Sequence, residues 1–219
     1  MLGARRKHGA LVALVPLALG FFIWLGLPLH TAGQQSSTPL QFDPLSPDEI
    51  GATLQISAED QNVQGYLGGA RYQHILTQRF DDGLKREPGD SARLAESVFY
   101  IYERDGTAVD LTLLVVADLR ASRVVSATPS SGSRPPLARD ELRRAQEIAL
   151  ADERVQVLLA QQHVTPEQVA IYVYGLQPEE ASGPCARNRC MAFILAPVGQ
   201  PGGTFVSVNL TTQRVELTG

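Results

Sequence analysis

The chain has 219 residues, of which 44% are hydrophobic and 19% charged, as in ordinary globular proteins. Its net charge of −4 becomes −7 when the basic cluster Arg5–Lys7 is set aside. Such an acidic chain lacks the basic stripe that displaces counterions from nucleic acid, so we expect no nucleic-acid partner. Arginine far outnumbers lysine, which occurs only at Lys7 and Lys85, and this bias favours a bacterial source with a GC-rich genome.

The first 32 residues have the pattern of an export signal. Arg5–Lys7 precedes an uncharged run, Gly9–Leu29, which as a helix would span ~30 Å, the thickness of a bilayer core. The basic flank places the N-terminus in the cytoplasm and the remaining chain outside. We expect a single-pass anchor in the cell membrane that contacts the lipid bilayer through residues 9–29. A cleaved signal, ending at the poor site His30–Ala32, and a buried soluble helix are the alternatives.

Two motifs recur about ninety residues apart. Pro44–Ile50 recurs as Pro136–Leu142 with an offset of 92 positions, and Val116–Val124 recurs as Ser207–Val215 with an offset of 91. Two separate matches at nearly one spacing indicate that a small domain has been duplicated. The period exceeds that of the familiar solenoid repeats, so the units are domains rather than stacked short repeats.

The repeat and the composition together divide the chain. Residues 33–41 are polar and predict a flexible tether, and the Ser/Gly/Pro cluster at 130–136 predicts a linker. Between and after them lie a first domain at 42–129 and a second at 137–219. Each should be an α+β unit in which one helical layer covers a four-stranded antiparallel sheet.

The first domain should begin with a helix. Ser46 is a good N-cap, Pro47 suits the first helical position, and Glu49 completes a capping box. A glycine-rich loop follows, and Asp105-Gly106 is a hairpin turn signal. Alternating tyrosines are expected on half-buried sheet faces rather than as a surface that stacks a ligand. The expected strands are Arg71–Phe80, Leu94–Glu103, Asp110–Ala117 and Arg123–Ala127.

The second domain should repeat this order. A helical stretch, Ala138–Gln162, has apolar residues on one side, and Asp152 is a point where it breaks and is capped again. The expected strands are Val169–Tyr174, Met191–Ala196, Thr204–Asn209 and Arg214–Leu217.

These residues resemble a known family. Phe42–Ile50 resembles the opening of the second N-terminal domain of copper-containing amine oxidases, and Leu84 with Glu87-Pro88 and Val115–Val125 resemble later parts of that domain. Pro135–Leu137 and Asp152–Leu159 resemble the linker and early helix of the third N-terminal domain. The resemblance covers most of residues 42–219. It implies two small α+β units, similar to cystatin-like folds, that are not the catalytic part of the enzyme.

Catalysis in that family needs residues that this sequence lacks. The cofactor tyrosine lies in an Asn-Tyr context and copper is held by a His-x-His pair with a third histidine. This chain has no Asn-Tyr, and its histidines, His8, His30, His74 and His163, are widely separated. The acidic pairs coincide with helix starts and turns. We therefore expect no enzyme activity, no catalytic residue, no metal site and no cofactor.

The two cysteines, Cys185 and Cys190, should form a structural disulfide outside the cell, where such pairs oxidise. A redox pair and a metal site are the alternatives. Arg187, Asn188 and Arg189 lie inside that short loop. They form either a solvated turn or a constrained basic prong that contacts a partner.

The expected function is that of a membrane-tethered, exported, non-catalytic interaction or accessory protein with an unknown protein partner. One alternative is a subunit that supplies N-terminal domains in trans to a copper amine oxidase-like enzyme. A weaker alternative is a periplasmic inhibitor or chaperone.

Overall fold

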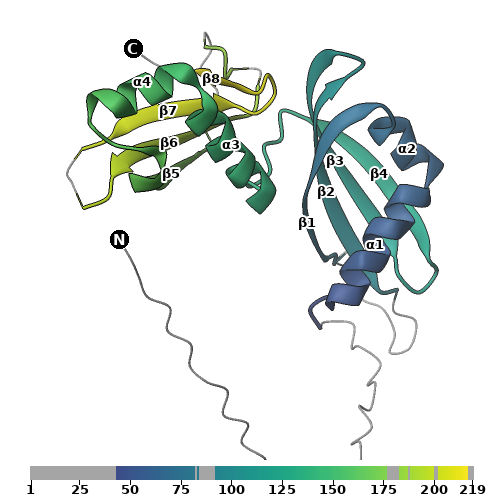
Figure 1. Cartoon of the computed structure of the whole chain (residues 1–219). Coiled ribbons are helices and arrows are strands. Elements are labelled where there is room, and N and C mark those ends of the chain that lie inside the picture. Colours follow the sequence, from purple (N-terminus) through teal and green to yellow (C-terminus); the bar gives the residue numbers. More distant parts are fainter. Residues whose placement is uncertain are drawn as a thin grey trace, which may run out of the picture. The chain divides into compact units, whose positions relative to one another are not determined.

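Two four-stranded antiparallel sheets, each preceded by a pair of helices, form the part of the chain that the computed structural model describes (Figure 1). The described residues are 43–81, 83, 92–176, 183–186, 188–199 and 202–216. The expected anchor at 9–29, the tether at 33–41, and Leu84 with Glu87-Pro88 lie outside them. Among the described residues, no helix is long and apolar enough to cross a membrane.

The first module consists of α1 (Pro47–Glu59), α2 (Gln61–Leu67) and the strands β1 (Ala70–Arg79), β2 (Leu94–Arg104), β3 (Thr107–Asp118) and β4 (Arg123–Ser131). The strands pair in chain order, β1-β2-β3-β4. The strand predictions are confirmed, except that β4 continues to Ser131 and so takes in the first residues of the predicted linker. The predicted glycine-rich loop is partly helical, because Asp60 caps α2 by accepting from the backbone N–H groups of Asn62 and Val63.

The second module consists of α3 (Arg139–Ala151), α4 (Glu153–Gln161), a 3₁₀ turn η1 (Pro166–Gln168) and the strands β5 (Val169–Leu176), β6 (Cys190–Pro197), β7 (Thr204–Asn209) and β8 (Arg214–Glu216). These strands also pair in chain order. Asp152 breaks the helix as predicted, and it stands 92 positions after Asp60. The shared element order and strand order confirm that the two units have the same construction.

One predicted hairpin turn is confirmed, and the turn after the third strand is repeated in both sheets. The Asp105-Gly106 hairpin is confirmed, with φ of 51° and 76° at the two positions, as a tight two-residue turn requires. The β3–β4 turn begins at Asp118 and reaches positive φ at Ser122, while the β7–β8 turn begins at Asn209 and reaches positive φ at Gln213. Both turns therefore follow the 91-position offset of the sequence repeat.

β2 serves two cores because successive side chains of a strand point to opposite faces. Phe99 and Ile101 are buried in the first module's core with Val63 of α2. Tyr100 and Tyr102 are buried in the core cluster of the second module. The predicted alternation of this strand is confirmed, but its tyrosine face is fully rather than half buried.

Candidate functional site

A buried arginine holds the start of the first module. The Glu49 carboxylate accepts from the backbone N–H of Ser46 at 2.8 Å, and from Arg93 Nε at 2.8 Å and Nη2 at 3.0 Å. The other guanidinium N–H groups of Arg93 donate to the carbonyl oxygens of Asp43 (2.8 Å) and Pro44 (3.0 Å). We call this arrangement, an arginine that binds a helix-start glutamate and two preceding carbonyls, the clasp.

The second module contains the same clasp. Glu141 accepts from the backbone N–H of Ala138 at 2.8 Å, and from Arg189 Nε at 2.6 Å and Nη2 at 2.9 Å. Arg189 donates further to the carbonyls of Pro135 (3.0 Å) and Pro136 (2.8 Å). Atom for atom, the five interactions match those of the first module. The clasp is therefore a property of the duplicated unit.

Each clasp arginine is held in place by its position at the start of the second strand of its sheet. Arg93 directly precedes β2, and Arg189 directly precedes β6. Their carbonyl oxygens accept from the backbone N–H groups of Leu119 (2.9 Å) and Leu210 (2.8 Å), in the turn that follows the third strand of each sheet. The guanidinium is thereby fixed at the sheet end that faces the helix start.

The two clasps differ in burial. The side chains of Arg93 and Glu49 are 5% and 18% exposed, whereas those of Arg189 and Glu141 are 0% and 1% exposed. Arg93 lowers the pKa of Glu49 to about 2, mainly through its hydrogen bond, and Glu49 in turn raises the pKa of Arg93. A charge pair removed from water is tolerated only when its hydrogen bonds are nearly complete, and the carbonyl partners supply this completion.

Two tyrosines from the first module cover the second clasp. The hydroxyl of Tyr102 donates to Glu141, and the Arg189 guanidinium lies 4.5 Å from the centre of the Tyr100 ring. The Tyr100 hydroxyl donates to Asp110. Burial, more than any other cause, raises the pKa values of both tyrosines well above their usual range, so both remain neutral donors at physiological pH.

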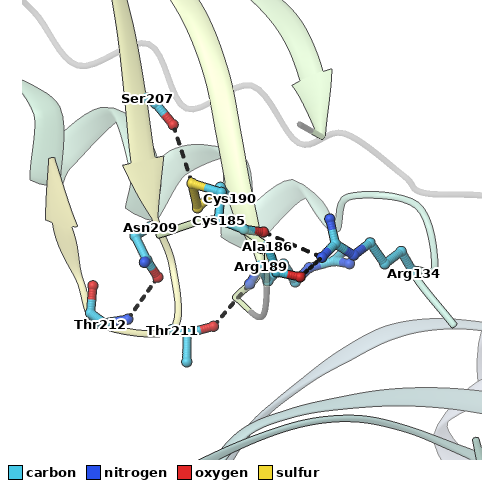
Figure 2. Close-up of a disulfide and its surroundings, with 9 residues drawn as sticks. All are labelled: Arg134, Cys185, Ala186, Arg189, Cys190, Ser207, Asn209, Thr211 and Thr212. Carbon is cyan, nitrogen blue, oxygen red and sulfur yellow. Dashed lines mark hydrogen bonds between the residues drawn. A yellow bond between two sulfur atoms is a disulfide. The ribbon is translucent and has the colours of Figure 1, made fainter. Parts of the chain in front are cut away.

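Two further arginines of the first module and linker bind carbonyl oxygens of the second module. Arg71 of β1 donates to the carbonyls of Leu210 (3.2 Å) and Thr211. Arg134 donates to the carbonyls of Cys185 (3.3 Å) and Ala186 (3.1 Å), as Figure 2 shows. The modules are thus joined by directed hydrogen bonds as well as by apolar burial.

The disulfide prediction is confirmed. Cys185 and Cys190 are bonded, with their Cα atoms 5.5 Å apart, and both are buried. The disulfide lies beside Ser207 and Asn209 (Figure 2). Its loop ends at Arg189, whose backbone N–H donates to Thr211 Oγ1 at 3.0 Å. The disulfide therefore stabilises the segment that presents the clasp arginine.

The predicted basic prong is wrong for Arg189. Its side chain points into the clasp and is fully buried, because its charge is matched by Glu141 and by the linker carbonyls. Asn188 is half buried, and Arg187 lies outside the described residues. The disulfide and Arg189, which the sequence suggested as two separate features of this loop, therefore belong to one buried arrangement.

Sequence reasoning missed Arg93 altogether. The available signal was an arginine immediately before the second strand of each unit, combined with a glutamate three residues after each helix cap. The second module has four more residues than the first between its clasp glutamate and its clasp arginine. Arg93 and Arg189 are therefore 96 positions apart, and the 92-position repeat does not align them.

The acidic pairs Asp48-Glu49 and Asp140-Glu141 do mark helix starts, as predicted. No group of three potential metal-ligating side chains occurs within the described ranges.

Comparison with known proteins identifies the fold. No protein-family model and no curated protein matches the chain. Among the solved structures that match is a copper-containing benzylamine oxidase from Hansenula polymorpha, with a TM-score of 0.56 and 14% sequence identity. The match covers 82% of this chain and 30% of the oxidase chain, so this chain spans less than a third of that protein. The α+β fold of this chain is therefore similar to part of a copper amine oxidase.

Proposed function

We propose that this chain is an exported, membrane-tethered, non-catalytic interaction protein built from two domains like the N-terminal domains of copper amine oxidases. The anchor is supported by the uncharged run Gly9–Leu29 behind the basic cluster Arg5–Lys7. The domain assignment is supported by the sequence resemblance together with the fold similarity to the benzylamine oxidase.

The observation that best supports a non-catalytic role is which groups the buried charged side chains bind. Arg93, Arg189 and Glu141 are the charged residues that are buried among the described residues. Together with Glu49 they bind one another and the carbonyls before each first helix. Charges arranged for catalysis face a cleft where a substrate is received. The charges of the first clasp face the carbonyls of Asp43 and Pro44 instead. Those of the second clasp face the linker carbonyls and two tyrosines of the neighbouring module, which suits a part that holds two domains in a fixed relation.

A second candidate is a subunit that supplies N-terminal domains in trans to a copper amine oxidase-like enzyme. The coverage of the structural match favours it, because 82% of this chain corresponds to only 30% of the oxidase chain. A separate chain carrying the remaining domains would complete such an enzyme. Under this proposal the partner is a catalytic chain, and it is found beside this protein in the membrane.

The test uses the full chain in its native membrane. The protein should stay in the pellet after alkaline carbonate extraction, and crosslinking there should link it to a specific partner. Release as a soluble product that starts near Gly33 would contradict the tether. Purified protein supplied with copper should not oxidise benzylamine, and turnover would contradict the non-catalytic role. A crosslinked partner with quinone absorbance would select the second candidate.

A further inference from the structure

A pocket of the second module is lined by three arginines. It has a volume of about 640 Å³ and lies where α3 ends and α4 begins, beside the β7–β8 turn and β8 (Figure 1). Arg144 comes from α3, Arg154 from the first turn of α4, and Arg214 from the start of β8. The carboxylates of Asp152 and Glu216 also line the pocket, so arginines outnumber carboxylates there. This local excess of positive charge stands out because the chain as a whole is acidic.

The first module lacks two of these arginines at the equivalent positions. At the 92-position offset of the repeat, Arg144 corresponds to Ala52. At the same offset, Arg154 corresponds to Asn62. Helices α2 and α4 nevertheless start in the same way, because the backbone N–H groups of Asn62 and Arg154 each donate to the capping aspartate at 2.9 Å. The shared construction of the two modules therefore does not depend on arginine side chains at positions 144 and 154.

Arg154 and Asp152 are the members of the lining that already bind one another. Arg154 donates from Nε (3.0 Å) and Nη2 (2.8 Å) to the Asp152 carboxylate, and from Nη2 to the Val215 carbonyl at 2.7 Å. The hydrogen bond from the Arg154 side chain is the main cause that lowers the pKa of Asp152, so this carboxylate stays ionised and its charge is matched. Nη1 of Arg154 has no acceptor among the described residues and can bind a further group.

The other two arginines are more available to a ligand. Arg144 donates to Gln213 at 3.2 Å and lies 3.5 Å from Glu147, in an exposed ion pair of a kind that contributes little to stability. The Arg214 side chain is exposed and has no hydrogen bond or ion pair within the described ranges. Glu216, which is half buried, is the one lining carboxylate that opposes an anion without being paired to a described arginine.

We propose that this pocket binds a phosphate monoester group. Such a group carries nearly two negative charges at neutral pH and has three acceptor oxygens, so it can accept from arginines of α3, α4 and β8 together. Guanidinium forks also bind carboxylates, but a carboxylate has a single charge that one arginine matches, as Arg154 does for Asp152. The phosphate belongs to a soluble phosphorylated molecule or to a lipid headgroup, and the chemistry is the same for both. The site depends on neither the membrane anchor nor a catalytic partner.

Calorimetric titration of the full chain in neutral-detergent micelles tests the pocket with inorganic phosphate at constant chloride. The wild type should bind phosphate saturably. R144A and R214A should each weaken binding by about five- to tenfold, because each removes a charge-assisted donor. E216Q should strengthen binding, because it removes the opposing carboxylate, and a variant that failed to fold could not give this result. The matched controls, R143A on the same helix but outside the pocket and R123A at the equivalent of position 214 in the first module, should leave binding unchanged.

A second titration distinguishes the two sources of the phosphate group. Mixed micelles that contain short-chain phosphatidic acid should weaken the apparent binding of inorganic phosphate if a lipid headgroup occupies the pocket. Unchanged binding in those micelles identifies the ligand as a soluble phosphorylated molecule, and either result supports the site. The proposal is overturned if the wild type shows no saturable phosphate binding, if R144A and R143A have equal effects, or if E216Q fails to strengthen binding.

Discussion

The two clasps use the same groups in the same geometry and differ in what covers them. In the first module the Glu49 side chain keeps 18% of its surface exposed, whereas in the second Glu141 keeps 1% and accepts the Tyr102 hydroxyl. In the second module, strand β2 of the first module covers the ion pair that fixes the helix start. We call this covered ion pair the joint between the two modules. The difference shows that a local capping arrangement can also serve as an inter-domain contact while keeping the five hydrogen bonds that the two clasps share.

Removing the arginine from each clasp should give the largest difference between the modules. In R189M, Glu141 loses its cation while fully buried, so we expect the unfolding free energy to fall by about 3–5 kcal/mol. In R93M, the partly exposed Glu49 regains some hydration, and we expect about 1–2 kcal/mol. Urea denaturation of both variants measures this contrast, and equal losses would contradict the role assigned to burial.

A double variant separates the cost of leaving Glu141 unpaired from the cost of losing the other contacts of Arg189. Combining R189M with E141L removes both charges, so the protein should recover a large part of the stability that R189M alone loses. Additive losses in the double variant would mean that Arg189 stabilises the module through its carbonyl contacts at Pro135 and Pro136 rather than through Glu141.

The disulfide sharpens the comparison because only the second clasp has one beside it. Replacing Cys185 and Cys190 by serine should lower the stability of the second module by about 2 kcal/mol, the value expected for so short a loop. The start of β6 should loosen with it, since Arg189 lies in the same loop. Thiol trapping of protein isolated without reductant should find no free thiol, and two free thiols would remove this explanation.

The tyrosine that joins the modules should have a smaller effect. In Y102F the hydrogen bond to Glu141 is lost, but the ring and the clasp remain, so we expect a loss of about 1–2 kcal/mol. Y72F is the matched control, because Tyr72 lies on the adjacent strand and is 44% exposed. A loss for Y72F as large as that for Y102F would show that the hydroxyl bond to Glu141 is not specific.

The smallest effect should appear in how steeply the unfolding free energy changes with pH. The folded pKa of Glu49, about 2, lies below the ordinary carboxyl value. Its contribution to stability is therefore complete above the unfolded pKa and is lost as the pH falls towards 2. E49Q should reduce the acid dependence of the unfolding free energy in that window. An unchanged slope in E49Q would contradict the pairing with Arg93.

Sequence reasoning reached those features that depend on neighbouring residues. The capping box at Ser46, the helix break at Asp152, the Asp105-Gly106 hairpin and the strands all follow from local rules. The disulfide follows from the closeness of Cys185 and Cys190 in the sequence and from the exported location that the sequence predicts. The clasps could not be predicted this way, because Arg93 and Glu49 are separated by 44 positions and meet only through the strand order. Arg189 was misassigned for the same reason: its charged neighbours in sequence suggested a surface, and its partners lie elsewhere.

Hydrogen exchange followed by mass spectrometry tests the joint most directly, since it reports on each strand separately. The account predicts that R189M increases exchange in α3, β6 and also in the Tyr100–Tyr102 end of β2, which belongs to the other module. R93M should increase exchange in α1 and at the start of β2, leaving the second module protected. Exchange in R189M that stays confined to the second module would contradict the claim that its clasp holds the two modules together.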